Sequence, residues 1–297
     1  MHEVPKHFRD EVRGTPVVDA DFVHFEGLRE LRMGGCKSFT DAVFVHLRGI
    51  HTLDMSQCSQ EGITDAAFAH LAGIHTLSMF DCSQPGITDA AFAHLRGIHT
   101  LNMDGCNQTG ITDAAFAHLR GIHTLGMLDC SQAGITDAAF AHLRGIHTLQ
   151  MSGCNQAGIS NAAFAHLCGI HTLCMRRCSR ITDAAFVHLR GIHTLNMGYC
   201  DQLGITDAAF AHLRGIQALD MSGCVQAGIT DAAFEYLHGI DTLVLNFCRQ
   251  AGITGAAFEH LRGIGLLLMN SCRPSRIAAA RAIGLRVSLN MRTGSGY

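Results

Sequence analysis

Hydrophobic and polar positions alternate along this chain in one pattern that returns at a fixed interval. The sixteen letters GITDAAFAHLRGIHTL at 110–125 return unchanged at 134–149, and close copies occur along almost the whole sequence. The leucine that opens each L-x-M-x-x-C motif recurs at steps of 22 or 24 residues from Leu31 to Leu219, and variants continue to Leu267. A self-similar period of this length predicts a tandem array in which each unit packs mainly on its neighbours.

Each unit of the period predicts one strand and one short helix. In L-x-M the apolar residues alternate with variable ones, which is the period of a strand. In ITDAAFAHL, Phe68 and Leu71 share one face at helical spacing, and Thr64 or Asp65 can cap the helix. Arginines such as Arg96 are expected where that helix ends, so that they complement its dipole.

The period and its apolar letters are those of a leucine-rich repeat, since Ile50, Leu53, Met55 and Cys58 fit L-x-x-L-x-L-x-x-C. We therefore predict an α/β leucine-rich-repeat solenoid. Helices are wider than the roughly 4.8 Å strand spacing, so it should curve into a horseshoe with a parallel β-sheet on the concave face and short helices on the convex face. The predicted boundaries are an N-terminal cap at 1–16, an array of about eleven to twelve units of 22–24 residues at 17–290, and a C-terminal tail at 291–297.

The cysteine that ends each strand motif is followed by G-I-T-D in nearly every unit. This register resembles the cysteine-containing leucine-rich repeats, as in the substrate-binding repeats of F-box proteins, which present targets for ubiquitination. The resemblance covers roughly residues 17–290 and implies a recognition module, with a substrate-recognition adaptor as the narrower alternative. The residues before the array are too few for an F-box, and Pro5 to Val12 predicts a short amphipathic helix that caps the first repeat.

Composition narrows the class of protein further. With 47% hydrophobic and 16% charged residues, the 297-residue chain can bury a large core. A net charge of −3 provides no general basic face, so we expect no nucleic-acid partner. No apolar run is long enough to cross a membrane and the first residues do not form a signal peptide, so we expect a cytoplasmic or nuclear monomer.

Cysteine and histidine recur in rows. Eleven of the thirteen cysteines occupy one register, and one thiol per unit lacks the paired short spacing of zinc sites. We therefore expect buried structural thiols and no metal or cofactor. One histidine row, near the helix ends, runs from His46 to His212, and another, before the strands, from His51 to His193. A transition-metal row is an alternative for the second, and its protonation near pH 6.5 should destabilise the fold.

The units differ mainly inside L-x-M-x-x-C, while the helix letters stay nearly fixed. Leu and Met should face the core, so the first and second variable positions should face the concave side and the third its margin. We predict that this surface binds another protein with both a basic and an acidic segment. The candidate residues are an acidic stretch with two apolar anchors (Phe80, Asp81, Asp104, Leu128, Asp129), a basic and aromatic stretch (Arg176, Arg177, Tyr199), and Asp220, Asn246 and Phe247.

Two alternatives stay open beside protein binding. The first alternative is a reactive thiol or an enzymatic role centred on Cys174. This cysteine stands at a first variable position with Arg176 two residues later, and a nearby cation lowers the pKa of a thiol. Catalysis also needs a positioned base and an oxyanion site, and no Ser–His–Asp order, phosphate loop or HExxH motif is present, so we expect no enzyme. The second alternative is an engineered or consensus scaffold, which the near-identity of the copies suggests.

Overall fold

The computed structural model describes residues 17–289, so the predicted N-terminal cap and C-terminal tail lie outside the described residues. The chain divides into two compact units. The first comprises the residues up to 149 together with 156–159, and the second comprises 150–155 and the residues from 160 onward. Each unit is built from the repeated strand and helix that the sequence predicts.

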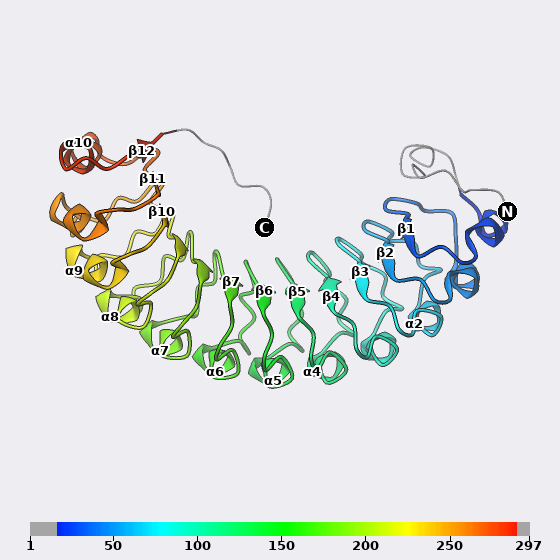
Figure 1. The fold of residues 1–297 in the computed structure, drawn as a ribbon. Coiled ribbons are helices and arrows are strands. Elements are labelled where there is room, and N and C mark those ends of the chain that lie inside the picture. The colour runs from blue at the N-terminus through cyan, green and yellow to red at the C-terminus, as the bar shows by residue number, and fades with distance from the viewer. Residues whose placement is uncertain (1–16, 290–297) are drawn as a thin grey trace. The chain divides into compact units, whose positions relative to one another are not determined.

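In the first unit, short strands pair in parallel in the order of the chain. They are β1 (Glu30–Arg32), β2 (Thr52–Asp54), β3 (Thr76–Ser78), β4 (Thr100–Asn102) and β5 (Thr124–Gly126). The helical turns of this unit lie on the other side of the chain from the strands (Figure 1). They are η1 (Asp19–Phe25), η2 (Asp41–Leu47), α2 (Asp65–Phe68), α3 (Asp89–Phe92), α4 (Asp113–Phe116) and α5 (Asp137–Phe140). Strand β6 (Thr148–Gln150) lies at the division between the units.

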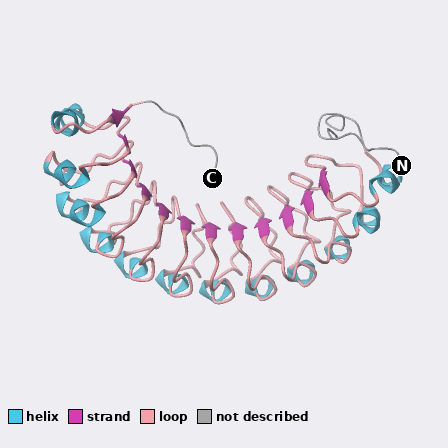
Figure 2. Cartoon of the chain, in the orientation of Figure 1, coloured by secondary structure: helices cyan, strands magenta, loops and turns pink. Residues whose placement is uncertain are grey.

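The second unit repeats this arrangement. Its parallel strands are β7 (Thr172–Cys174), β8 (Thr194–Asn196), β9 (Ala218–Asp220), β10 (Thr242–Val244), β11 (Leu266–Leu268) and β12 (Val287–Ser288). Its helices are α6 (Asn161–Phe164), α7 (Asp183–Phe186), α8 (Asp207–Phe210), α9 (Asp231–Phe234), η3 (Glu235–Leu237), η4 (Ala256–Leu261) and α10 (Pro274–Ala282). Within each unit, strands line the inner side and helices the outer side (Figure 2). We call the strand side of each unit its concave strand face.

The core lies between strands and helices and contains the invariant apolar letters of the repeat. In one repeat, Phe92, Leu101, Met103 and Cys106 are completely buried, and the same letters are buried in the neighbouring repeats. Because the variable letters alternate with these residues along the strand, they point to the opposite, concave side. The predicted α/β leucine-rich-repeat solenoid is therefore confirmed within each unit.

A pair of hydrogen bonds joins the helix start of one repeat to that of the next. The carboxylate of Asp89 accepts from both the backbone N–H and the hydroxyl of Thr112, each at 2.7 Å. The hydroxyl of Thr112 in turn accepts from the N–H of Ala114 at 3.3 Å and so caps α4. The backbone N–H of Asp89 donates to the carbonyl of Gly110 at 3.0 Å. The letters G, T and D of GITD thus form one inter-repeat link, which we call the Asp–Thr link.

One repeat carries asparagine in place of the linking aspartate. The amide oxygen of Asn161 accepts from the N–H of Thr182 at 2.9 Å, but its Nδ2 donates to the Thr182 hydroxyl at 2.8 Å. The Thr182 hydroxyl therefore accepts a hydrogen bond from residue 161, whereas the Thr112 hydroxyl donates one to Asp89. Thr182 is also the N-cap of α7 and makes no side-chain cap bond, whereas the caps of the other helices α2 to α9 all do. The change from Asp to Asn keeps the link and removes the cap.

The cysteine register also serves the packing of adjacent repeats. The Cys106 thiol donates to the carbonyl of Met79 at 3.0 Å, and Cys82 donates to that of Met55 at 3.2 Å. Burial raises the pKa of each of these two thiols to about 12. A thiol in this state is a small apolar side chain with one hydrogen bond, and it is neither a metal ligand nor a nucleophile.

The arginine after each helix lies beyond the place that we expected. Helix α3 ends at Phe92, so Arg96 stands past its last turn and does not complement the helix dipole. Instead its Nε donates to Nδ1 of His118 in the next repeat at 3.3 Å, and Arg190 makes the same bond to His212. The expectation was wrong because these helices last only a single turn. In the first histidine row, His70, His118, His142 and His212 accept from this arginine, whereas His46 pairs with Glu26.

We predict that the Asp–Thr link can be strengthened or broken at single positions. Asn161→Asp should restore the donor role of the Thr182 hydroxyl and its cap, and should raise the free energy of unfolding by about 0.5–1 kcal/mol. Asp89→Ala leaves the polar groups of Thr112 without their acceptor and should lower it by about 1–3 kcal/mol. Urea unfolding followed by circular dichroism measures both. Asp89→Asn is the matched control and should lower the free energy of unfolding less than Asp89→Ala does, since Asn161 keeps the link in its own repeat. Equal losses of stability in the two variants would contradict the stabilising role of the Asp–Thr link.

The cysteines should differ sharply in reactivity toward a thiol reagent. Cys168 is exposed and should be alkylated first, Cys174 is half-buried and should follow, and Cys82 and Cys106 should react only on unfolding. Iodoacetamide labelling at pH 8 followed by peptide mass spectrometry gives the rate at each site. Labelling of Cys82 or Cys106 at the rate of Cys168 would show that the thiols do not hold the repeats together as described.

Candidate partner-binding surface

The variable positions of each strand motif lie on the strand and on the tight turn that follows it. The third variable position takes a left-handed backbone, with φ of +54° at Asp81, +57° at Tyr199 and +60° at Phe247. Other repeats place glycine there, as at Gly105 and Gly223. Bulky residues adopt this conformation uncommonly, because Cβ crowds the backbone. The third position is therefore a strained turn that presents its side chain, a feature that the alternation of a strand does not predict.

A basic and aromatic cluster lies on this surface in the second unit. The guanidinium carbons of Arg176 and Arg177 are 5.5 and 5.7 Å from the centre of the Tyr199 ring. Tyr199 keeps 38% of its surface exposed. The three residues come from two neighbouring repeats, and the structure brings them together as the sequence predicts. We call them the Arg–Tyr cluster.

A glycine makes room for the aromatic side chain of the Arg–Tyr cluster. A Cβ atom at Gly223 would lie 2.5 Å from two carbons of the Tyr199 ring, which no side chain tolerates. A Cβ atom at Gly198 would lie 3.4 Å from Nε of Arg176, which is an ordinary contact distance. The Tyr199 ring thus leans closely over Gly223 of the next repeat, and this glycine belongs to the site although sequence reasoning did not name it.

The charge of the Arg–Tyr cluster is not neutralised within the chain's described part. No carboxylate of residues 17–289 forms an ion pair with Arg176 or Arg177. The Nε atom of Arg176 is also removed from solvent without a hydrogen-bond acceptor. The neighbouring turn is fixed independently, since Nδ2 of Asn155 donates to the carbonyl of Arg177 at 2.9 Å.

The acidic stretch lies on the concave strand face of the first unit. The Asp104 carboxylate accepts from the N–H of Leu128 at 2.7 Å. Burial, and then the nearby Asp129 charge, raise the pKa of Asp104 above its ordinary value, although the Leu128 bond opposes this shift. Phe80 and Asp81 are exposed beside it, and Leu128 is half-buried. The five predicted residues of this stretch therefore form an acidic surface with two apolar side chains.

The remaining predicted residues are partly occupied by bonds within the sheet. The Asp220 carboxylate accepts from the backbone N–H of Ser222 at 2.8 Å and from its hydroxyl at 2.5 Å. The Asn246 amide oxygen accepts from the backbone N–H and the side-chain amide of Asn270 at 2.8 and 3.0 Å. Phe247 is half-buried on its left-handed turn.

Cys174 lies on the concave strand face with a hydroxyl as its neighbour. Its Sγ is 3.0 Å from Oγ of Ser152, a contact that sequence spacing did not reveal. His171, the nearest histidine in sequence, directs Nδ1 to the Thr172 hydroxyl at 3.1 Å. That atom of His171 is thus engaged elsewhere and does not serve as a base for the thiol.

The second histidine row forms a stack in the first unit. The ring centres of His51, His75, His99, His123 and His147 follow one another at 4.5–4.6 Å, with 11–12° between neighbouring ring planes. In parallel rings the in-plane lone pairs point the same way and do not converge on one ion. Within residues 17–289 there is no group of three or more His, Cys, Asp or Glu side chains that could hold a metal ion. The geometry therefore gives no support to the metal alternative for this row.

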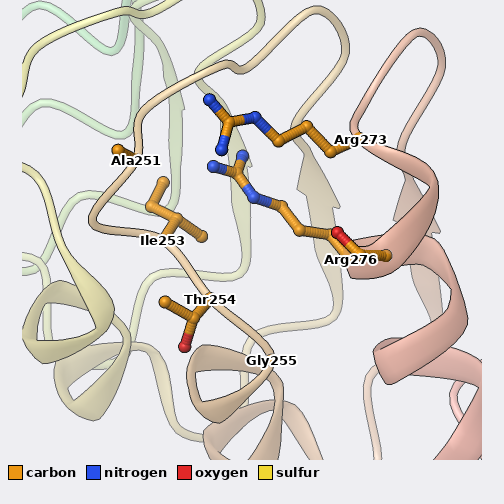
Figure 3. A pocket seen from close by; sticks show the side chains of 7 residues that line it. Ala251, Ile253, Thr254, Gly255, Arg273 and Arg276 are labelled. Carbon is orange, nitrogen blue, oxygen red and sulfur yellow. The ribbon is translucent and has the colours of Figure 1, made fainter.

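A small pocket of about 180 Å³ lies at α10, where Arg273 and Arg276 extend side by side above Ile253 (Figure 3). Arg276 is buried and donates from Nη1 to the carbonyl of Cys248 at 3.1 Å and from Nη2 to that of Gln250. In earlier repeats a buried glutamine makes the corresponding bond, as Gln132 does to the carbonyl of Cys106 at 2.8 Å. Arg276 thus replaces that glutamine in the last repeats, which is a structural role.

Several solved structures are similar in fold to this chain. A chain in the structure of the Toll–Spatzle complex, a hub in Drosophila development and innate immunity, matches with a TM-score of 0.63 and 16% identity over 82% of this chain and 33% of that one. A chain in the TLR13–ssRNA13 complex matches with a TM-score of 0.62 and 17% identity over 82% and 39%. A chain in the octameric complex of Latrophilin 3, Unc5D and FLRT2 (LRR) matches with a TM-score of 0.63 and 19% identity over 95% and 88%.

These likenesses establish the leucine-rich-repeat fold and nothing finer. The chain spans about a third of the matched Toll-complex chain and 39% of the TLR13-complex chain. Neither a protein-family profile nor a curated protein sequence matches it significantly. In the part of the chain that the structure describes, no helix has the length and apolar character needed to cross a lipid bilayer.

We predict that the histidine stack makes stability depend on pH. Loss of solvent in the stack, followed by the charges of neighbouring histidines, lowers the pKa of His75 and His123 below the ordinary 6.5. Below about pH 6.5 the unfolded chain then binds more protons than the folded one, so stability should fall as the pH falls and level off below the folded pKa values. Thermal unfolding from pH 7.5 to 5.5 should show a decreasing melting temperature.

The control for this pH dependence comes from the chain itself, which carries Gln217 where other repeats carry a histidine of this row. A variant with His75→Gln and His123→Gln should retain its fold and lose part of the pH dependence. A melting temperature that is constant over this range in the unmodified chain, or an unchanged slope in the variant, would contradict the role of the stack.

Proposed function

We propose that the chain is a protein-interaction module that binds a partner protein through the concave strand face of its repeats. The observation that carries the proposal is the placement of sequence variation. Letters that differ from repeat to repeat lie on that face, while the core and helix letters are nearly constant. A structural filler needs no such variation, whereas a recognition surface needs a different side chain wherever it meets a different part of its partner.

The composition of the candidate surface supports the same function. Arginine and tyrosine are among the residues enriched at binding hot spots, and the Arg–Tyr cluster combines them with a glycine that makes room for the ring. The acidic stretch of the first unit offers a second contact of opposite charge. A partner with an acidic segment for the cluster and a basic segment for the stretch would match both.

The fold relatives are consistent with a binding role, since the Toll chain is described with Spatzle and FLRT2 with Latrophilin 3 and Unc5D. The TLR13 structure is described with single-stranded RNA, so RNA is the alternative that the experiment must separate from protein. The narrower proposal of a substrate-recognition adaptor, of the cysteine-containing F-box type, rests on the repeat letters alone.

The proposal includes no catalytic step, because the thiol of Cys174 meets a hydroxyl and the Nδ1 atom of His171 is directed away from it. None of the thirteen cysteines forms a disulfide bond within residues 17–289, which suits a reducing compartment, and we propose a cytoplasmic or nuclear monomer.

Site-specific photo-cross-linking tests which face binds. A benzophenone amino acid is placed at Leu128 or Phe247 on the concave strand faces, and at the exposed Ala165 after α6 as the control. We expect the same protein to be cross-linked in cell lysate from Leu128 or Phe247 and not from Ala165. Arg176→Glu with Arg177→Glu should weaken that complex by about 30-fold, the effect of one hot spot of about 2 kcal/mol. Circular dichroism verifies that each variant is folded.

Two results would contradict the proposal. Cross-links obtained only from Ala165 would move the binding surface to the helix side. Cross-linked material that ribonuclease removes and protease leaves intact would identify RNA and not protein as the partner.

A further inference from the structure

We propose that the Arg–Tyr cluster is a receptor for a doubly charged phosphate group on the partner, that is, for a phosphorylated side chain. This inference rests on the proposed function and specifies what its central contact recognises.

The Arg–Tyr cluster carries two positive charges. Arg176 and Arg177 are permanently cationic, and both guanidinium groups are held over one Tyr199 ring. The ring face attracts each cation without neutralising it, and neither cation has an ion-pair partner in residues 17–289. A phosphorylated side chain carries a charge of about −1.5 to −2 and balances both, whereas one carboxylate leaves a net positive charge.

The donors give the chemistry of the ligand. Arg177 is exposed and Arg176 half-buried, and no carboxylate of residues 17–289 pairs with either guanidinium group. Guanidinium groups present their N–H donors in a planar fork that matches two oxygens of one phosphate or carboxylate group. An incoming oxyanion can therefore accept from guanidinium donors that no carboxylate of the described chain occupies.

The backbone holds the cluster in place before a ligand binds. Arg177 and Tyr199 both have φ of +57°, at a turn position where some repeats carry glycine, as at Gly105 and Gly223, and others a side chain, as at Asp81 and Phe247. A bulky residue in this conformation costs about 1–3 kcal/mol, and such strain concentrates at binding and switching sites. The Asn155 amide, which donates to the carbonyl of Arg177, fixes the turn from the preceding repeat. The side chains are thus positioned by the fold, which lowers the ordering cost of binding.

Two exposed apolar residues close to the cluster in sequence indicate what accompanies the phosphate. Leu203, four residues after Tyr199, is 83% exposed, and Val225, two residues after the glycine beneath the Tyr199 ring, is 52% exposed. The loop after Cys178 is two residues shorter than in most repeats and carries the exposed Arg180. The surface suits a peptide segment with an apolar side chain near its phosphorylated residue, since exposed apolar groups beside a polar anchor are typical of interfaces.

Nuclear magnetic resonance of labelled tyrosine rings tests the inference directly. The chain has three tyrosines, and Tyr236 provides an internal control, because Arg214 lies 4.9 Å from its ring centre without a second arginine. Phenyl phosphate, a minimal phosphorylated side chain, should shift the Tyr199 signal saturably and leave Tyr236 unchanged. Benzoate, which has the same ring with a single carboxylate charge, should bind at least about tenfold more weakly, because it balances only one guanidinium charge.

Variants show which groups bind the phosphate. Arg176→Gln and Arg177→Gln should each weaken phenyl phosphate by about tenfold, while Arg214→Gln should not change its affinity, because Arg214 stands outside the cluster. Equal affinity for benzoate and phenyl phosphate would overturn the phosphate assignment in favour of a carboxylate. Equal shifts of Tyr199 and Tyr236, or no saturable shift of Tyr199, would overturn the receptor itself.

A second measurement separates this inference from the proposed function. If the cross-linked partner is obtained equally well from untreated lysate and from lysate treated with phosphatase, the concave face binds a protein and the phosphate assignment is wrong. If phosphatase removes the cross-link at Phe247, where the benzophenone residue leaves the Arg–Tyr cluster intact, and phosphatase inhibitors restore it, both proposals are supported. Absence of any cross-link from the concave positions contradicts the proposed function whatever phenyl phosphate does.

Discussion

The link between an aspartate and the threonine of the next repeat is the interaction on which the regularity of each unit depends. Hydrophobic burial supplies most of the driving force for folding, but it is non-directional and does not fix how far one repeat slides along another. The carboxylate of Asp89 accepts two hydrogen bonds from Thr112 and so admits one register only. The same register aligns Leu77 with Leu101 and Leu101 with Leu125 in the parallel sheet.

Fixing the register in this way leaves the concave letters free to change. The buried letters must fit the neighbouring repeat and the GITD letters must complete the link, so both are constrained. A variable residue on the strand face contributes to neither, and even a residue with a large ring such as Tyr199 is accommodated by a glycine one repeat later. The chain can therefore hold different binding groups on a nearly invariant scaffold, as solenoid proteins generally do.

The sequence was sufficient for the fold and for the membership of the Arg–Tyr cluster, and it was insufficient for contacts between repeats. Period and alternation specify strand, helix and core, because these depend on neighbours within one repeat. The bond from Arg96 to His118, the thiol bond from Cys106 to Met79 and the contact of Cys174 with Ser152 all depend on the spatial offset of adjacent repeats. The length of the repeat does not determine that spatial offset. The left-handed backbone at the third variable position was missed for another reason. Glycine occupies this position in some repeats, as at Gly105 and Gly223, but Asp81 and Phe247 occupy it in others, so the sequence shows no uniform glycine signal.

The Arg–Tyr cluster brings together features that occur singly elsewhere, since buried glutamines also keep unpaired atoms and Phe247 also occupies a left-handed turn, and this combination is the reason to assign function to it. Elsewhere a polar group on the concave face finds a partner within the sheet, as Asp220 does with Ser222 and Asn246 with Asn270. At the cluster, a buried donor of Arg176 stays unpaired and two large residues occupy strained turns. Costs of about 1–3 kcal/mol for each such feature are large beside the marginal stability of a folded chain. Features of this kind concentrate where a ligand offsets them, and an oxyanion bound by the two arginines would offset their like charge.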